Sequence, residues 1–401
     1  MTAPDALVIG GGLIGLACAW RAAHDGAAVT VVDETPGGEA RGGASQVAAG
    51  MLAPVTEVAY GEEELLRLTI HSARRWPTFA AEVEAAGGST VNYRPHGTLL
   101  VGFDADDARV LDELREFQVE LGLDVQQLRG GACRQREPLL SPRVRAGLLA
   151  GEDHQVEPRR VVAALLRALE AAGGRLDRRR VAKVEHDGTR VQGVVLADGT
   201  TLRAPQVVLA AGCWSGRVEG LPDEVVPPVR PVKGQVLELR TRAGEAQVGA
   251  TVRGLVRGRS IYLVPRGDGR AVVGATQEER GEDTTVTAGA TRQLLDDAAR
   301  VVPAVDELEL TATLVGLRPG TPDNRPLIGP GGLEGLLVAT GHHRHGVLLA
   351  PVTADAIAAW LAGHQPDPVV TVADPQRSGL RRRGARVEGG ADEGAEPRRP
   401  A

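Results

Sequence analysis

Four residues near the start of the chain have the types and spacing of a nucleotide-binding turn. Gly10, Gly12 and Gly15 form a Gly-x-Gly-x-x-Gly pattern, and Asp33 follows at about the required offset of roughly 20 residues. The first glycine permits a tight turn, the second lets the backbone approach a pyrophosphate, and the third lets a helix pack closely on a strand. Asp33 can accept a hydrogen bond from a ribose hydroxyl. We therefore predict a dinucleotide site, the alternative being a glycine loop without a ligand.

A second stretch with binding potential is the small-residue run at 41–54, which contains Ser45. Small residues let a backbone lie against a flat or phosphorylated ligand, and the Ser45 hydroxyl can donate a hydrogen bond to it. The alternative for this run is a flexible surface loop.

The elements around the glycine pattern form one βαβ unit: a strand at 6–9, a helix to His24 and a second strand at 29–33. The apolar run at 204–212 ends in glycine, as a parallel strand covered on both faces would. Near the end of the chain, a strand and a glycine turn precede a predicted helix at 347–362. Between 227 and 303, strands with a two-residue period at 234–239, 259–264 and 270–275 predict a second, largely antiparallel sheet. This order predicts an α/β fold.

Composition limits the classes of partner. The 401 residues carry a formal net charge of −6, which gives no reason to expect nucleic acid or an anionic membrane as partner. Three scattered cysteines, Cys18, Cys133 and Cys213, argue for reduced thiols and against a disulfide framework or a zinc site. The first strand leaves no room for a signal peptide, and the apolar run at 347–361 is too short for a membrane span and contains Asp355. We expect a soluble, cytoplasmic protein.

Nine motifs follow one another along the chain: the glycine pattern with Asp33, AAGML at 48–52, VEP at 156–158, AGCWSG at 211–216, PVKGQ at 231–235, YLVPR at 262–266, VGAT at 273–276, GLRPGT at 316–321 and GHHRHG at 341–346. In these motifs and their order, the sequence resembles the FAD-dependent glycine oxidases of thiamine biosynthesis, in the D-amino-acid oxidase superfamily. The resemblance covers roughly residues 5–363.

The resemblance implies a discontinuous, Rossmann-like FAD-binding domain, consistent with nucleotide-type segments at both ends and in the middle of the chain. We expect this domain at 1–90, 147–220 and 309–365, and a substrate-binding domain at 91–146 and 221–308. The segment 373–401 has hardly any apolar residues, so we expect a disordered tail.

The resemblance also implies which residues bind FAD. The amides of Gly346, Val347 and Leu348, at the start of the last helix, would stabilise negative charge on the reduced flavin. The expected cofactor-binding residues are Gly10, Gly12, Leu13, Ile14, Gly15, Asp33, Glu34, Ala44, Ser45, Ala49, Gly50, Met51, Val181, His342, His343, Arg344, His345, Gly346, Val347 and Leu348. The three histidines suggest a metal site, but on a tight glycine turn at a flavin we expect them to pack and hydrogen-bond, and we predict no metal.

For the substrate, the resemblance assigns Arg318 to the carboxylate as a bidentate fork. Tyr262 would close over the substrate, Arg344 would lie beside it, and Met51 completes the expected substrate contacts. The alternatives from the residues alone are a structural ion pair for Arg318 and a core position for Tyr262.

The chain also departs from the family pattern. Ser260 and Gln277 stand where the family has a histidine and a methionine, which leaves the amine preference open. Because no cysteine lies near Arg318 in the sequence, we expect FAD to be bound noncovalently.

The resemblance implies oxidation of glycine, sarcosine or D-alanine to the imine with reduction of O2 to H2O2. The imine would supply the thiazole of thiamine, with the thiazole synthase system as a possible partner and a homo-oligomer as the expected state. The alternatives are a D-amino-acid dehydrogenase, a sarcosine-type oxidase, a nicotinamide-dependent dehydrogenase if the glycine pattern is considered alone, or a non-catalytic flavin-bound assembly protein.

Overall fold

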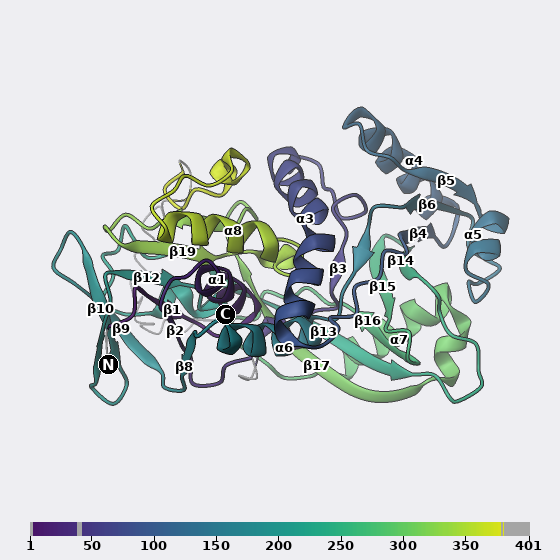
Figure 1. The fold of residues 1–401 in the computed structure, drawn as a ribbon. Helices are drawn as coiled ribbons and strands as arrows, with labels where there is room; N and C mark the ends of the chain where they lie inside the picture. The colour runs from purple at the N-terminus through teal and green to yellow at the C-terminus, as the bar shows by residue number, and fades with distance from the viewer. Residues whose placement is uncertain (1–2, 38–41, 378–379, 381–401) are drawn as a thin grey trace, which may run out of the picture.

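The computed structural model describes residues 3–37, 42–377 and 380. Its framework is two large sheets that lie side by side along the long axis of the molecule (Figure 1). Arg41, the first residue of the small-residue run, and positions 378–379 and 381–401 of the expected tail lie outside the described residues.

The first sheet has six strands in the order β18-β19-β12-β1-β2-β8. The five strands from β19 to β8 are parallel, and β18 adds to the edge antiparallel to β19. The predicted α/β fold is confirmed. The strands are β1 (Ala6–Ile9), β2 (Val29–Val32), β8 (Arg175–Asp177), β12 (Gln206–Leu209), β18 (Leu327–Pro330) and β19 (Leu336–Thr340).

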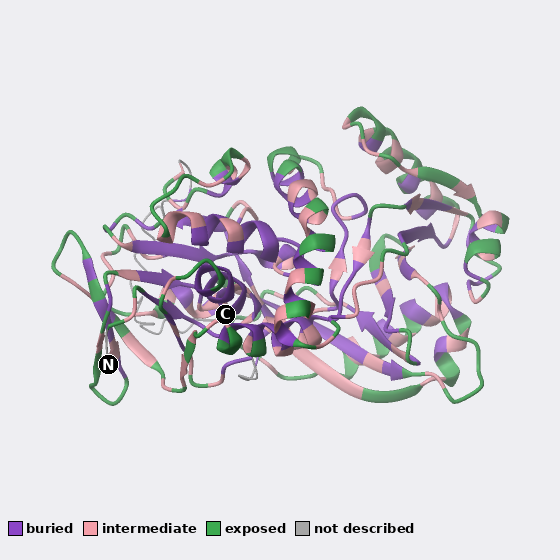
Figure 2. Cartoon of the chain, in the orientation of Figure 1, coloured by how far each residue is buried: buried purple, intermediate pink, exposed green. Residues whose placement is uncertain are grey.

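The two faces of this sheet are covered by different layers. Val8 packs toward the helices, while Leu7 and Ile9 pack toward a small sheet, as the alternation along a strand requires. Both layers bury the central strands (Figure 2). The helices are α1 (Leu13–His24), α3 (Glu63–Gly87), α6 (Pro158–Ala171) and α8 (Ala350–Leu361), and the small sheet is β9 (Val181–His186), β10 (Val191–Leu196) and β11 (Thr201–Arg203).

The second large sheet has eight strands in the order β17-β13-β16-β15-β14-β4-β6-β5. Every neighbouring pair is antiparallel except β14 with β4, so the prediction of a largely antiparallel sheet is confirmed. Its strands are β4 (Thr98–Gly102), β5 (Gln126–Arg129), β6 (Ala146–Ala150), β13 (Arg230–Arg240), β14 (Thr251–Val256), β15 (Arg259–Pro265), β16 (Arg270–Gly274) and β17 (Glu309–Gly320), and α4 (Ala105–Glu120), α5 (Gly130–Arg136), α7 (Ala288–Val301) and η2 (Pro303–Glu307) accompany them.

The sheet topology differs from the expected segment boundaries in two places. Strand β17 begins at residue 309, where we expected an FAD-binding segment, but it pairs along its length with β13 in the antiparallel sheet. Strand β6 likewise spans the expected boundary at 147 and pairs with β4. The remaining elements are α2 (Ala44–Val47), β3 (Met51–Leu52), β7 (His154–Gln155), η1 (Gly212–Arg217), η3 (His343–His345) and η4 (Pro368–Ala373).

The chain remains attached to the body beyond residue 373. Arg377 donates to Asp323 at 2.8 Å and to the carbonyl oxygens of Arg325 and Pro326, and Leu380 is buried beside Leu327.

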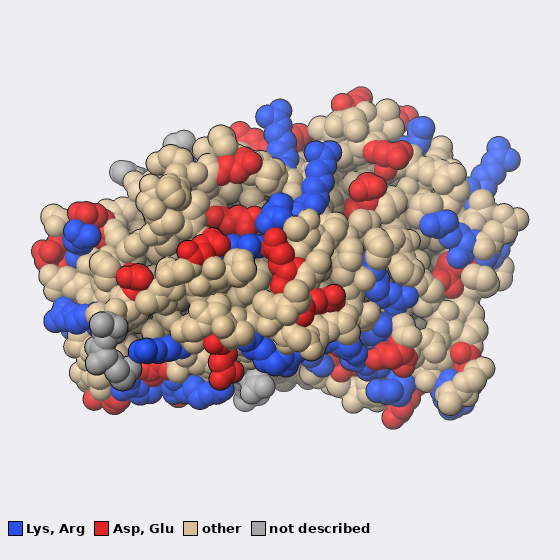
Figure 3. All heavy atoms as spheres, viewed as in Figure 1, with Lys and Arg blue, Asp and Glu red and all other residues tan. Residues whose placement is uncertain are grey.

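None of the described helices is both long enough and apolar enough to cross a membrane. On the face in Figure 3, acidic and basic side chains are interspersed.

Candidate active site

A cavity of about 1130 Å³ is lined by residues from both large sheets. Most of the predicted site residues line it, although they come from distant parts of the chain. These are Gly10, Gly12, Leu13, Ile14, Asp33, Glu34, Ala44, Ser45, Ala49, Gly50, Met51, Val181, Tyr262, Arg318, His342, His343, Arg344, Gly346 and Val347.

The glycine pattern adopts the geometry that a dinucleotide turn requires. Gly10 has a φ of +108°, and a Cβ there would lie 2.5 Å from the carbonyl oxygen of Ala210. A Cβ at Gly15 would lie 1.9 Å from the Gly10 oxygen, so the third glycine permits the close contact of α1 with β1. At Gly12 a Cβ would meet only the Ser45 hydroxyl, at 3.3 Å, so this backbone is open to the cavity.

Asp33 and Ser45 already hold parts of this turn together. The Asp33 carboxylate accepts from Gly11 N at 2.6 Å and from Thr35 N at 2.7 Å. The Ser45 hydroxyl accepts from Leu13 N at 3.0 Å, at the start of α1. Ser45 therefore satisfies one of the free amides of the helix N-terminus and still has its own proton to donate.

Three of the predicted cofactor contacts do not line the cavity. Gly15 lies at the contact of helix and strand, as described above. His345 points toward Glu57, with its Nδ1 3.6 Å from the carboxylate. Leu348 is buried, and its carbonyl oxygen accepts from Ser72 and Trp76 at 2.7 and 2.9 Å.

The last helix also starts later than expected, at Ala350 instead of residue 347. Pro351 has no N–H and cannot donate to the carbonyl of Val347, and the short helix η3 precedes the start. Within the described residues, the backbone N–H groups of Val347 and Leu348 donate no hydrogen bond. The free donors expected at this turn are therefore present one turn before α8.

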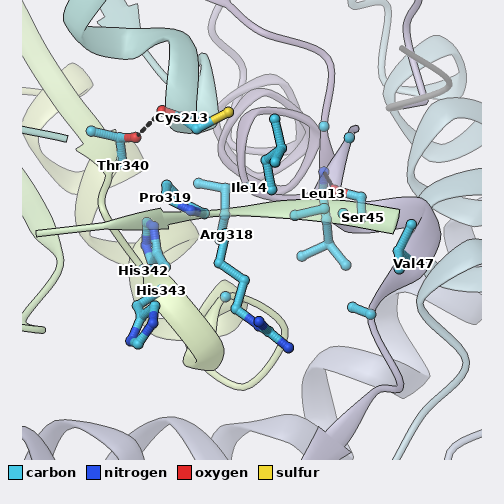
Figure 4. A pocket seen from close by; sticks show the side chains of 18 of the residues that line it. Leu13, Ile14, Ser45, Val47, Cys213, Arg318, Pro319, Thr340, His342 and His343 are labelled. Carbon is cyan, nitrogen blue, oxygen red and sulfur yellow. Dashed lines mark hydrogen bonds between the residues drawn. The ribbon is translucent and has the colours of Figure 1, made fainter. Parts of the chain in front are cut away.

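Arg318 and Tyr262 each occupy a space that a glycine leaves free. Arg318 extends from β17, and a Cβ at Gly234 on β13 would lie 2.5 Å from its Nη1. A Cβ at Gly274 on β16 would lie 2.4 Å from the Tyr262 hydroxyl oxygen. Figure 4 shows Arg318 in the cavity, with His342 and His343 on one side and Leu13, Ser45 and Val47 on the other.

Arg253, Arg318 and Arg344 line the cavity, and they differ in their partners. Arg344 Nη2 lies 2.6 Å from Glu62, and Arg253 Nη2 lies 3.8 Å from Glu57. Arg318 donates to the carbonyl oxygen of Thr276 at 3.1 Å, and no described carboxylate lies within 4 Å of it. Arg318 is therefore a half-buried cation without a neutralising partner among the described residues.

Residues 341–346 form a second turn, called here the histidine turn, and its three histidines are neutral at ordinary pH. Burial lowers the pKa of His342, His343 and His345 from 6.5 to about 3 in each case. His342 Nε2 lies 3.0 Å from the Thr353 hydroxyl, whereas neither ring nitrogen of His343 has a partner in the described part of the chain. Among the described residues, no group of three or more His, Cys, Asp or Glu side chains could hold a metal ion.

Sequence reasoning missed five charged residues that line this cavity: Glu57, Arg180, Arg217, Glu219 and Arg253. Arg253 lies directly opposite Tyr262 in the pairing of β14 with β15, a relation that depends on strand register. Glu57 belongs to no motif, and no local signal could have identified it. Ser260 and Gln277, the two departures from the family pattern, also line the cavity.

Comparisons with known proteins find relatives over nearly the whole chain. The chain is 34% identical over 389 residues to a bifunctional ThiO/ThiG protein of Synechocystis, covering 94% of this chain and 54% of that protein. It is also 34% identical to a glycine oxidase of Pseudomonas putida, covering 90% of this chain and 95% of that protein. The chain thus spans about half the length of the bifunctional curated relatives and nearly all of that glycine oxidase.

Solved structures are also similar to this chain over nearly its whole length. The crystal structure of glycine oxidase from Geobacillus kaustophilus superposes with a TM-score of 0.84 at 28% identity, over 94% of this chain and 99% of that one. The family profile described as FAD dependent oxidoreductase matches residues 5–360, the span that contains the glycine turn, Tyr262, Arg318 and the histidine turn. With that match over most of its length, the chain belongs to the family of FAD-dependent oxidoreductases.

Proposed function

We propose that this protein oxidises glycine, and also sarcosine or D-alanine, to the imine and transfers the electrons to O2, giving H2O2. The observation that carries the proposal is Arg318, a cation at the cavity with no carboxylate partner among the described residues. A substrate carboxylate would provide the missing negative charge and accept two hydrogen bonds from the guanidinium.

The cavity fits the cofactor of the family. Gly10 and Gly12 leave room for a pyrophosphate at the start of α1, and Asp33 and Glu34 offer carboxylates for ribose hydroxyls. The free amide of Val347, which lines the cavity, would face negative charge on the flavin ring. When bound, FAD supplies the acceptor for the hydride and passes the electron pair to O2. We propose noncovalent binding, because Cys213, the cysteine that lines the cavity, is buried and has a raised pKa of about 12, mainly from desolvation.

The residues near Arg318 would orient the substrate. Burial raises the pKa of Tyr262, so its hydroxyl stays protonated and can donate a hydrogen bond to the carboxylate. Arg344, which is paired with Glu62, would lie beside the same group. Positioning by these three side chains would present the α-C–H to the hydride acceptor, and no strong protein base is required once the amine is neutral.

We further propose that the imine serves the thiazole of thiamine. The support is the ThiO/ThiG relative, whose name joins the two functions in one longer chain. A thiazole synthase is therefore the protein partner to test, and cytoplasmic location and homo-oligomerisation remain predictions.

The test is peroxide release by the purified protein on addition of glycine. A yellow protein that releases flavin on acid precipitation and forms peroxide stoichiometrically with glyoxylate would support both proposals. Flavin that stays with the precipitate would contradict noncovalent binding. Turnover of glycine with an artificial electron acceptor but not with O2 would favour the dehydrogenase alternative.

A further inference from the structure

Glu57 belongs to a short segment, residues 55–58, whose backbone is fixed by a buried carboxylate. Asp153 accepts from Val55 N at 2.9 Å and from the N and Oγ1 of Thr56 at 2.7 and 2.6 Å. The guanidinium of Arg253 also donates to the Thr56 carbonyl oxygen. Glu57 is therefore presented to the cavity from a rigid support.

The Glu57 carboxylate has negative charge close to the cavity and no hydrogen bond of its own. Its side chain is 13% exposed, and its nearest cationic or ring nitrogens are Arg253 Nη2 at 3.8 Å and His345 Nδ1 at 3.6 Å. Both distances exceed hydrogen-bond length. His345 is neutral because burial lowers its pKa to about 3. Within the described residues, neither oxygen of this carboxylate accepts a hydrogen bond.

A half-buried carboxylate without donors costs free energy unless a ligand supplies them. Arg253, paired directly with Tyr262 in the β-ladder, holds Glu57 beside the part of the cavity that contains Tyr262 and Arg318. An α-amino acid carries a carboxylate and an ammonium group two bonds apart. If Arg318 takes the carboxylate, an acceptor nearby is needed for the ammonium.

We infer that Glu57 is the residue that recognises the substrate amine, accepting hydrogen bonds from its N–H groups. The inference rests on the proposed oxidation of amino acids and deepens it, because it makes the site select for substrates with both a carboxylate and an amine. The charges of Arg318 and Glu57 act in opposite directions on the Tyr262 pKa, in agreement with both lying near its hydroxyl.

The test compares glycine with acetate, which has the carboxylate and lacks the amine. In Glu57→Gln, loaded with FAD, glycine should bind roughly ten- to a hundredfold more weakly, the value of a hydrogen bond to a charged group. Acetate should bind as well as to the wild type or better, because a neighbouring negative charge is gone. Both dissociation constants come from flavin absorbance titrations without O2, and the KM for glycine from peroxide release.

The matched control is Glu64→Gln, which removes the same charge from a side chain that is 69% exposed and pairs with Arg325. For each ligand, the factor is the dissociation constant of the variant divided by that of the wild type. The factor for glycine divided by the factor for acetate decides the question. A ratio below about 5, well short of the value of a charged hydrogen bond, would overturn the inference. Should Glu57→Gln lose its FAD, the same ratio on Glu57→Asp decides. Wild-type protein that binds glycine but forms no peroxide would contradict only the oxidase proposal.

Discussion

Arg318 differs from its two neighbouring arginines in what neutralises it. Arg344 and Arg253 have carboxylates at 2.6 and 3.8 Å, whereas Arg318 donates to the backbone carbonyl oxygen of Thr276. A half-buried guanidinium without a counter-ion costs free energy in the free protein, and a carboxylate ligand would recover it. This difference is the physical basis for assigning the substrate carboxylate to Arg318.

Replacing Arg318 by alanine should therefore reduce kcat/KM for glycine. Truncating one partner of a buried, hydrogen-bonded charge pair costs roughly 2–5 kcal/mol. At 1.36 kcal/mol per decade this is about thirtyfold to several thousandfold. Steady-state kinetics on the FAD-loaded variant measure the effect. Arg318→Lys should not restore activity well, because a point charge cannot reproduce the fork. A kcat/KM within a fewfold of wild type would remove Arg318 from the active site.

Gly234→Ala tests the same group without removing its charge. The new Cβ would lie 2.5 Å from Arg318 Nη1, so the guanidinium must move from its present place. Because small misplacements of a positioning group are costly, we expect kcat/KM to fall about tenfold or more while FAD content stays unchanged. Gly289→Ala is the matched control, since a Cβ there meets nothing within 4 Å. Equal kinetics for the two variants would contradict the placement of Arg318.

At the scale of elements, two glycines of the turn at residues 10–15 should have different roles: Gly15 in packing and Gly12 in binding FAD. Gly15→Ala places a Cβ 1.9 Å from the Gly10 oxygen, so α1 cannot pack on β1 as it does now. We expect a stability loss of at least about 1–3 kcal/mol, the usual cost of overpacking. Gly12→Ala meets only the Ser45 hydroxyl, so it should fold normally and bind FAD more weakly. Urea unfolding and flavin titration separate the two effects. An alanine at 12 that destabilises as much as one at 15 would refute this division of roles.

Sequence periodicity predicted this unit well because its contacts are local. The strands at β1 and β2 and helix α1 lie within the first 33 residues, and the glycine spacing fixes the turn between them. The membership of β17 in the antiparallel sheet could not be predicted in the same way, since it depends on pairing with β13 some 80 residues earlier. Glu57 and Arg253 reach the cavity only through tertiary contacts, so no spacing in the sequence could identify them.

For the whole molecule, the buried histidine turn predicts a loss of stability in acid. The pKa values of His342, His343 and His345 are about 3 in the folded protein, whereas the ordinary value is 6.5. Below about pH 6.5 the unfolded chain therefore binds protons that the folded chain does not. Stability is complete above this pH and falls as the pH drops, by up to about 1.4 kcal/mol per pH unit for each histidine.

Asp153 acts in the opposite direction below about pH 6, because burial raises its folded pKa to about 6 from 3.8. For these four groups together, the slope between pH 6.5 and 5 should thus correspond to about two protons. His154, whose pKa is also lowered by burial, adds to this slope. Urea unfolding at several pH values, with FAD in constant excess, measures it. His343→Asn should reduce the slope by about one proton, since its ring makes no hydrogen bond within the described residues. An unchanged slope would show that this histidine titrates normally in the folded state.

The end of the ordered body gives a prediction about truncation. Arg377 donates to Asp323 and to two carbonyl oxygens. Burial raises the pKa of Asp323. The hydrogen bonds from Arg377 and Arg325 outweigh burial and hold this pKa at about 2. Leu380 adds a buried apolar contact. A chain ending at residue 380 should therefore keep the urea midpoint and FAD content of the full chain, because the residues after it are almost without apolar side chains.

A chain ending at residue 373 should instead be less stable by about 1–3 kcal/mol, since it loses the charged hydrogen bonds of Arg377 and the apolar burial of Leu380. The full-length double variant Arg377→Ala with Leu380→Ala is the control, and it should reproduce most of this loss while leaving the chain length unchanged. Urea unfolding at fixed FAD concentration compares the three proteins. Equal midpoints for the chain ending at 373 and the full chain would mean that the contacts of Arg377 and Leu380 contribute nothing to the stability of the fold. The tail would then begin at residue 373, as its composition predicts.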